Sequence, residues 1–311
     1  QVSSINSAAE LAKPDAWALN VAQAITANAT DWYQALANVA AAIATEKSLT
    51  APAQGSIDAT SQAIAKSLLT GKEKAILLGN AAAHHADAAN LLVLASWIAE
   101  QTGASVGYLT EAANTVGAQL VGATAQNDGL NAQAMLSTDQ LKAMFLMNVE
   151  PEFDTRVGLA ANAQLAKMPL VVSLSPFKAN QDIADVMLPV APFTETSGSF
   201  VNAEGRLQSF HAVVKPLAET RPAWKVLRVL ANMLGLPQLA FETSQDVLKQ
   251  ISATPLNLSN ACSSEVRLAG AVDTPCVASI YQLDSLVRRA PSLQLTADAR
   301  NSQAVAEGVH A

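Results

Sequence analysis

The sequence has few cysteines, which limits the metal chemistry that it can support. Only Cys262 and Cys276 occur among 311 residues, and neither belongs to a C-x-x-C motif. A zinc or iron–sulfur site of the usual kind needs three or four closely placed thiolates or imidazoles. We therefore expect no cluster in this chain. The two thiols fit a free pair in a reducing compartment better than a disulfide.

Charge and long apolar runs are also scarce. Charged residues make up 14% of the chain and the formal net charge is −7, with no lysine and arginine cluster of the kind that binds nucleic acid. No apolar run reaches the roughly 18 to 20 residues that span a bilayer. The first residues lack a basic region followed by an apolar core, so we expect no signal peptide. A chain that begins at Gln1 is expected to be a fragment or a processed product.

The small charged fraction has two interpretations. Part of the surface is buried against partner proteins, because charged residues are depleted at the cores of interfaces. Alternatively, the many alanines replace charged residues on an ordinary surface. Both interpretations stay open at this point.

Three motifs of common enzyme classes are missing. No G-x-G-x-x-G follows a strand and no G-x-x-x-x-G-K-[ST] occurs, although these motifs place backbone N–H groups on phosphates. A G-x-S-x-G nucleophile elbow is absent as well. Asp182 and Asp185 lie three apart with no histidine nearby, so acid–base catalysis is unsupported. The side chains of His84 and His85 point apart on a helix or strand, which favours a solvated or turn-capping role over a metal ligand or proton relay.

Apolar residues, which make up half of the chain, follow two successive patterns. Up to residue 70 their spacing is helical, and it predicts helices over 15–27, 31–45 and 57–70, with a mobile lead-in over 1–14 and a linker over 50–56. From residue 75 on, short apolar runs alternate with helical patterns, which predicts a mostly parallel, Rossmann-like sheet flanked by helices. The predicted strands are 75–78, 106–109, 143–148, 169–175 and 186–190, and the predicted helices are 87–102, 156–167, 222–234 and 244–251.

The remaining segments are expected to be less regular. We predict loops over 122–137 and 194–206, a turn at Glu150–Pro151, a strand or helical turn over 280–289, and little order in the last 20 residues. The apolar side chains of the 222–234 helix are expected to fill its buried side: Trp224, Leu227, Val229, Leu230, Met233 and Leu234. These elements divide the chain into a helical segment and linker over 1–70, an α/β domain over 71–251 and an irregular extension over 252–311.

Polar and charged side chains gather just after the 186–190 strand. Hydroxyl groups at Thr194, Thr196, Ser197 and Ser199 precede an amide, two glycines, two carboxylates and one guanidinium within a dozen residues. One interpretation is a loop that embraces a polar, phosphate-bearing ligand. The other is a solvated loop held by internal caps and an Arg–Glu pair, and the composition alone favours this second interpretation.

The same stretch resembles the E-x-x-G-[ST]-x-x-N-x-E-G-R-x-Q signature of the molybdopterin oxidoreductases. The matching residues are Glu195, Gly198, Asn202, Glu204, Gly205, Arg206 and Gln208, and Ser199 stands where the family more often has threonine. Residues 215–237 are similar to the helix that follows this signature. The stretches 76–85 and 103–117 resemble one branch, the large iron–sulfur subunit of bacterial NADH:quinone oxidoreductase (complex I). The resemblance covers about residues 70 to 290.

This resemblance implies a molybdopterin oxidoreductase-like domain that serves as a scaffold. The parent subunit would carry electrons from NADH to quinone through iron–sulfur clusters upstream of this chain, on the cytoplasmic side of the inner membrane. Partners would be those upstream domains and other subunits of the peripheral arm. No catalytic or metal-binding residue is then expected. The cofactor loop would be vestigial, with candidate residues Glu195, Ser199, Asn202, Glu204, Gly205 and Arg206.

Two other functions are compatible with the sequence. The chain could come from an active molybdopterin oxidoreductase such as a formate dehydrogenase, which predicts a pterin-shaped cleft at Ser199, Asn202 and Arg206. It could also be a stand-alone module that binds phosphate or a nucleotide.

Overall fold

The structure is an α/β arrangement of parallel strands flanked by helices, as the sequence predicts. The computed structural model describes residues 2–7, 20–125, 128–236, 239–253 and 279–300. These fall into two compact units, with described residues up to 111 in unit 1 and those from 112 on in unit 2. The division at residue 111 falls inside the predicted 71–251 domain, whose limits stay a prediction. Within the described residues, no helix is long and apolar enough to cross a membrane.

Unit 1 contains two pairs of parallel strands and a core of three helices. Strand β1 (Val2–Asn6) pairs with β2 (Val21–Thr26), and β3 (Ala75–Leu78) pairs with β4 (Ser105–Tyr108). The helical elements are η1 (Ala29–Asp31), α2 (Trp32–Lys47), α3 (Ala59–Thr70), α4 (Asn80–Ala83) and α5 (Ala88–Thr102).

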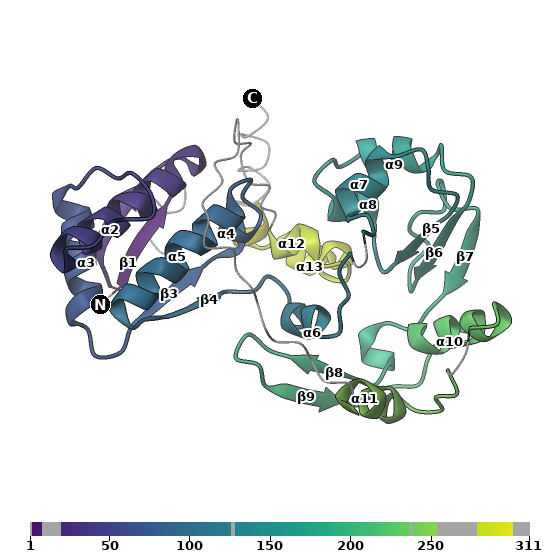
Figure 1. Ribbon diagram of the computed structural model, residues 1–311. Coiled ribbons are helices and arrows are strands. Elements are labelled where there is room, and N and C mark those ends of the chain that lie inside the picture. Colours follow the sequence, from purple (N-terminus) through teal and green to yellow (C-terminus); the bar gives the residue numbers. More distant parts are fainter. Residues whose placement is uncertain (1, 8–19, 126–127, 237–238, 254–278, 301–311) are drawn as a thin grey trace. The chain divides into compact units, whose positions relative to one another are not determined.

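The core of unit 1 is built around α2, on which α3 and α5 pack (Figure 1). Ile43 of α2 is fully buried together with Leu94 and Ile98 of α5. The interior face of α2 is rich in alanine, whose small side chain lets neighbouring segments approach closely. The linker approaches so closely that a Cβ atom on Gly55 would lie 2.4 Å from the Ala37 carbonyl oxygen. Glycine is therefore required there by space.

Two predictions for the start of unit 1 are wrong. Residues 2–6 form β1 instead of a mobile lead-in, and residues 21–26 form β2 instead of the end of a helix. Half-buried and exposed side chains alternate along β2, which is the two-residue period of a strand. The alanines in this stretch fit both the spacing of a helix and the alternation of a strand, so the apparent helical spacing gave the wrong prediction. Residues 15–19 of the predicted helix lie outside the described residues.

Helix α5 and its neighbours follow the prediction closely. The helix ends at Gly103, whose φ of 71° is left-handed, as expected of a residue that terminates a helix. Two lysines contact its last carbonyl groups: Lys47 Nζ donates to the Gln101 oxygen at 2.6 Å, and Lys74 Nζ donates to the Thr102 oxygen. Positive charge at a helix C-terminus opposes the negative end of the helix dipole, so both contacts stabilise α5.

Unit 2 is built on three parallel strands in the order β5–β6–β7. Their bounds are Met144–Met147, Val171–Ser175 and Val186–Pro189. Every residue of β6 is buried, as expected for the centre of a parallel sheet. Alternate side chains of β6 enter two cores. Val171 packs with Leu165, and Val172 and Leu174 pack with side chains of the helix that follows the signature.

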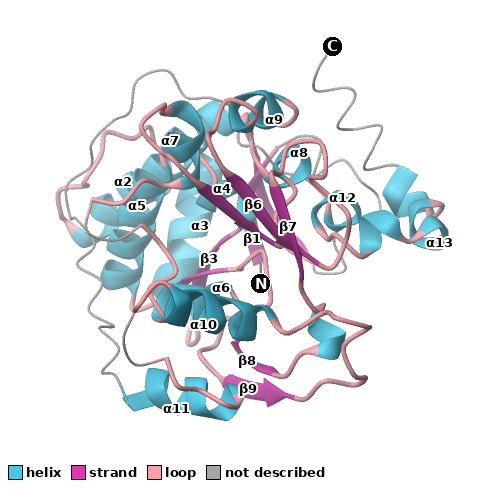
Figure 2. Cartoon of the chain, turned by 90° about the vertical axis from the view of Figure 1, so that its right-hand side faces the viewer, coloured by secondary structure: helices cyan, strands magenta, loops and turns pink. Residues whose placement is uncertain are grey.

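The other elements of unit 2 are mostly short. A hairpin, β8 (Gly198–Val201) and β9 (Leu207–Phe210), is separate from the three parallel strands (Figures 1 and 2). The helical elements are α6 (Thr115–Leu120), α7 (Ala132–Ser137), α8 (Pro151–Asp154), α9 (Ala160–Leu165), η2 (Phe193–Glu195), α10 (Ala223–Met233), α11 (Ser244–Ala253), α12 (Ile280–Leu283), η3 (Val287–Arg289) and α13 (Pro291–Gln294).

Several predictions for unit 2 need correction. The predicted loop 122–137 ends in α7, the predicted turn at Pro151 begins α8, and the helix expected over 156–167 is only α9. The predicted loop 194–206 contains most of the β8–β9 hairpin, the 280–289 stretch takes the helical alternative, and the last 20 residues include most of α13. These elements are short and are formed by local hydrogen bonds. Their sequences show no regular spacing of apolar residues from which they could be predicted.

Helix α10 has the predicted bounds but not the predicted burial. Leu227 is 37% exposed, Val229 49%, Met233 80% and Leu234 67%, whereas Trp224 and Leu230 are half-buried. The apolar face of α10 is thus only partly covered within the described residues. Cys262, Cys276 and most of the segment predicted to be irregular lie outside the described residues.

Candidate functional site

Asn202 closes the turn of the β8–β9 hairpin. Its side-chain Oδ1 accepts hydrogen bonds from the backbone N–H of Glu204 at 3.1 Å and of Arg206 at 2.9 Å. Its backbone carbonyl accepts from the N–H of Gly205 at 2.9 Å. Gly205 has a φ of 79°, a conformation that side chains other than glycine rarely adopt. The geometry of the turn thus explains the asparagine and the glycine of the N-x-E-G-R part of the signature.

The two strands of the hairpin are matched through paired side chains. The hydroxyl oxygens of Ser199 and Ser209, which lie opposite each other, are 2.8 Å apart. The rings of Phe200 and Phe210 meet edge to face with their centres 5.0 Å apart. A Cβ atom on Gly198 would lie 2.9 Å from the Phe210 ring, so this glycine makes room for the ring.

Residues 194–197 hold the chain that leaves the hairpin, which we call the 212–221 segment. The Glu195 carboxylate accepts from the N–H of Leu217 at 3.0 Å, and the Ser197 hydroxyl accepts from the N–H of Ala212 at 3.1 Å. The Thr194 carbonyl accepts from the N–H of Val213 at 2.8 Å. Three hydrogen bonds therefore hold the 212–221 segment against residues 194–197.

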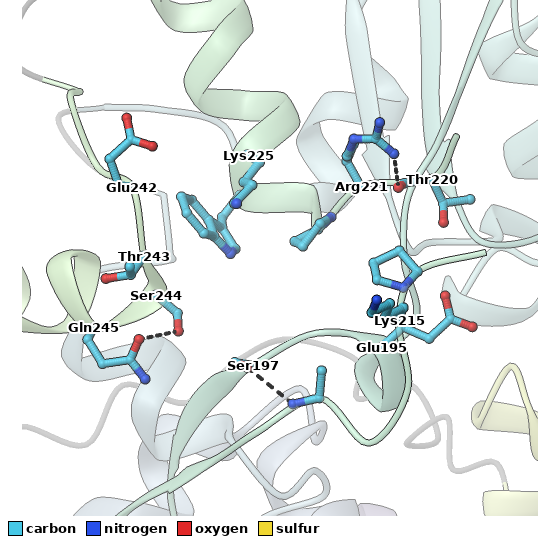
Figure 3. A pocket seen from close by; sticks show the side chains of 14 residues that line it. Glu195, Ser197, Lys215, Thr220, Arg221, Lys225, Glu242, Thr243, Ser244 and Gln245 are labelled. Carbon is cyan, nitrogen blue, oxygen red and sulfur yellow. Dashed lines mark hydrogen bonds between the residues drawn. The ribbon is translucent and has the colours of Figure 1, made fainter. Parts of the chain in front are cut away.

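An open pocket of about 560 Å³ lies between the 212–221 segment and the first residues of α10 and α11. Figure 3 shows Lys215 and Glu195 on one side of it, Glu242 to Gln245 on the other, and Lys225 between them. Its walls carry cations, carboxylates, hydroxyl groups and one indole. The residues that line the pocket are Glu195, Ser197, Ala212, Lys215, Pro216, Thr220, Arg221, Pro222, Trp224, Lys225, Glu242, Thr243, Ser244 and Gln245.

The structure places five of the six candidate residues on one hairpin and Glu195 in η2 just before it, but it does not bring the six around one pocket. Of the six, only Glu195 lines the 560 Å³ pocket. The Ser199 hydroxyl and the Asn202 amide oxygen are engaged within the hairpin, and Glu204, Gly205 and Arg206 are exposed at its turn. The Arg–Glu pair of the second interpretation is not formed, because Arg206 makes no ion pair among the described residues. The pocket residues from Lys215 to Gln245 were not predicted, because single cations and hydroxyls form no recognisable spacing.

The start of α11, at the edge of the pocket, is closed by its own side chains. Asp246 accepts from the N–H groups of Thr243 and Glu242, and the Thr243 hydroxyl accepts from the N–H of Asp246. The backbone N–H of Thr243, followed by its side chain, holds the pKa of Asp246 below its usual value. This carboxylate is therefore ionised beside the pocket across the neutral pH range.

The histidine pair has a structural explanation. His85 is buried and donates from Nε2 to the Ala29 carbonyl at 2.9 Å, while its Nδ1 accepts from the N–H of Asp87 at 2.9 Å. These two contacts fix the neutral tautomer. His84 is exposed and lies 2.7 Å from the Glu111 carboxylate. The two rings have separate partners, as the expected divergence of neighbouring side chains predicts.

The two aspartates that lie three residues apart in the sequence, Asp182 and Asp185, have different surroundings in the structure. Asp185 accepts from the N–H of Val171 at 2.7 Å at the start of β6. Asp182 lines a smaller cavity of about 240 Å³ that also involves Glu150 and Arg289. No group of three histidine, cysteine, aspartate or glutamate side chains placed to hold a metal ion occurs in the described ranges.

A buried cluster of two arginines and two carboxylates borders the smaller cavity. Arg289 makes a bidentate pair with Glu150, with N–O distances of 2.7 and 2.9 Å. Arg288 lies 3.1 Å from Asp154 and 3.7 Å from Glu150. Each guanidinium also covers an aromatic ring, Arg288 that of Phe153 and Arg289 that of Phe177. The cluster joins the C-terminal helical turns of unit 2 to α8.

Comparison with known proteins identifies the family. The molybdopterin oxidoreductase model matches residues 53–233, more than half of the 311-residue chain. The chain belongs to the molybdopterin oxidoreductase family. The match includes the β5–β6–β7 sheet, the hairpin and α10, so the fold of unit 2 is covered from its start to the end of that helix.

Similarity to curated proteins is limited to short stretches. The chain is 32% identical over 117 residues to "Probable oxidoreductase YjgC" of Bacillus subtilis, covering 37% of this chain and 12% of that protein. It is 38% identical over 74 residues to "Putative formate dehydrogenase SAB2186c" of Staphylococcus aureus, covering 24% and 7%. The matched stretches thus span about an eighth or less of the length of these relatives.

The residues of the signature do not fit a pterin cofactor within unit 2. A bound pterin would need several polar side chains that converge on one cavity. Here the hydroxyl of Ser199 and the amide oxygen of Asn202 already have partners in the hairpin. Arg206 lies at the exposed turn and does not line the 560 Å³ pocket. Neither of the two pockets described above is lined by Ser199, Asn202 or Arg206.

Proposed function

We propose that this chain is a scaffold portion of the large peripheral-arm subunit of a NADH:quinone oxidoreductase. In this role it holds upstream iron–sulfur domains of the same protein and neighbouring subunits in position, and it carries no pterin, cluster or catalytic residue of its own. The electrons pass from NADH to quinone through clusters housed outside this chain. The assembly lies on the cytoplasmic side of the inner membrane.

One observation carries this proposal: several polar side chains in the signature region are engaged in holding the fold. Asn202 closes the hairpin turn, Ser199 pairs across the strands, and Glu195 and Ser197 hold the 212–221 segment. A site that binds a cofactor needs hydrogen-bonding groups that are free to reach it, because an occupied acceptor gains little from a second partner. The resemblance of residues 76–85 and 103–117 to the complex I branch supports the choice of parent.

The second candidate is an active, pterin-binding oxidoreductase of the formate dehydrogenase kind. The names of the Staphylococcus aureus relatives favour it. The exposed Arg206 and Glu204 also favour it in part, because their side chains have no role inside the hairpin. A cofactor held chiefly by residues of other domains would be compatible with the geometry of this chain.

The test is to purify the complete parent protein from its host and to analyse its metal and pterin content. The scaffold proposal predicts iron and sulfide in stoichiometric amounts, NADH-dependent quinone reduction by the assembly, and no molybdenum, tungsten or pterin. Pterin recovered in stoichiometric amount, together with formate oxidation, would favour the second candidate. Arg206→Ala separates the two further, since it should lower pterin content in the second case and change neither cluster content nor activity in the first.

A further inference from the structure

The lining of the 560 Å³ pocket carries three cations and two carboxylates, so it has a small excess of positive charge although the whole chain is acidic. The chain carries 26 acidic and 19 basic residues. Between residues 211 and 225, however, Lys215, Arg221 and Lys225 face a single acid, Glu219. All three cations line the pocket, and Glu219 does not. The positive charge is thus local to this surface.

The two carboxylates of the pocket form contacts with groups other than the lysines. Glu195 accepts from the backbone N–H of Leu217, and Glu242 lies 3.2 Å from Arg228. Neither Lys215 nor Lys225 forms an ion pair with a described residue. Two ammonium groups therefore remain available to an acidic partner at the pocket.

Large apolar side chains lie next to the cations. Val213 is 82% exposed, Val214 55% and Leu217 74%, and they flank Lys215 in the 212–221 segment. The segment is held by hydrogen bonds from Thr194, Glu195 and Ser197, so its side chains are presented on a fixed backbone. Exposed apolar patches mark protein–protein contact surfaces, and the polar groups of such surfaces lie at the rim around the apolar centre.

Two features favour a protein segment over a small planar anion. The Lys225 ammonium lies 5.3 Å from the centre of the Trp224 ring, so a face of the indole is already used by a cation. Lys215, Arg221, Glu242 and Gln245 are themselves exposed, whereas a small-molecule site normally buries most of its ligand. Because Lys215 and Lys225 carry positive charges that form no ion pair within the described part of the chain, a protein segment with negative charge fits this surface best.

We propose that the pocket and the 212–221 segment form a docking surface for an acidic segment of a partner subunit, one that carries clustered Asp or Glu beside an apolar residue. This inference rests on the proposed scaffold function, and it adds where one partner binds and what that partner's surface contains. The acidic side chains contact Lys215 and Lys225, and the apolar side chain packs against Val213 and Leu217.

The experiment uses the complete parent protein in its host assembly, with a photo-reactive benzoyl-phenylalanine in place of Leu217. After irradiation, the cross-linked peptide is identified by mass spectrometry. We expect a peptide of another subunit with at least about three acidic residues in ten. Lys215→Glu/Lys225→Glu should lower the cross-linking yield about tenfold or more, because like charges at an interface repel. Lys66→Glu, a charge reversal on the exposed face of α3, is the matched control and should leave the yield unchanged.

A second variant and a small-anion probe complete the test. Reversing the acids of the identified peptide to lysine should restore cross-linking to the Lys215→Glu/Lys225→Glu protein. The inference is overturned if Leu217 cross-links to no other subunit, if the peptide is not acidic, or if the double reversal has the effect of the control. It is also overturned if inorganic phosphate or adenosine monophosphate raises the melting temperature of the wild type and not of the double variant. Iron content of the same preparations reports on the scaffold function separately.

Discussion

The buried arginine cluster of unit 2 yields the sharpest stability prediction. Glu150→Gln removes the charge that Arg289 pairs with in bidentate geometry and that Arg288 approaches at 3.7 Å. The side chains of Glu150 and Arg288 are 10% and 9% exposed, so water cannot replace the lost carboxylate. Breaking a buried ion pair on one side costs about 3 to 5 kcal/mol. Because Arg289 is 32% exposed and can be rehydrated, we expect the lower end, about 3 kcal/mol.

The assay is calorimetric unfolding of the wild type, of Glu150→Gln and of a control variant. For a domain of this size about 3 kcal/mol corresponds to a fall in melting temperature of about 6 to 12 °C in the transition of unit 2. The matched control is Glu219→Gln, whose carboxylate is 92% exposed and lies 3.5 Å from Arg221. This exposed pair is worth about 0 to 1 kcal/mol, so its loss should shift the transition by a few degrees at most. Equal shifts for both variants would refute the reasoning from burial.

Two further predictions concern unit 1. Gly55→Ala should destabilise the unit by about 1 to 3 kcal/mol in urea unfolding, because the new Cβ would meet the Ala37 carbonyl. Gly79→Ala, with open space around it, should cost less than about 0.5 kcal/mol, and a similar loss would contradict the steric argument. Asp58 caps α3 by accepting from the N–H of Ser61, which lowers its pKa from 3.8. Asp58→Ala should therefore cost about 1 kcal/mol at pH 7, and the difference from wild type should shrink as the pH falls below 3.8 through the lowered pKa. A difference that stays constant down to pH 2 would exclude the charged cap.

The sequence predicted those strands whose apolar residues form continuous, turn-bounded runs. Strand β3 was placed at its observed bounds, and β6 within two residues, because the β-branched pair Val171 and Val172 lies in a short, largely apolar run that is buried. Strands β1 and β2 were missed because each depends on pairing with the other, across about 15 intervening residues. Such pairing leaves no trace in local spacing, and the alanines of β2 fit a helix equally well.

The candidate site shows a different limit. The signature located the hairpin, but it could not tell whether Asn202 turns its oxygen toward a ligand or toward the backbone. Only the geometry shows that Oδ1 accepts from Glu204 and Arg206. The cations of the pocket were passed over for another reason. Lys215 and Lys225 are ten residues apart in sequence, and they line one pocket because Glu195 and Ser197 hold the segment between them.

A match to this signature therefore cannot by itself separate a cofactor-binding protein from a scaffold. Gly198 makes room for a ring, Gly205 supplies a left-handed turn, and Asn202 closes that turn, all without any ligand. A chain that lost its cofactor would still need these residues, because they form the turn and the ring contact of the hairpin. The residues that discriminate are those with no task in the hairpin. Arg206 is one of them, so a cofactor role of this loop should be detected most directly by replacing Arg206 and measuring the bound cofactor.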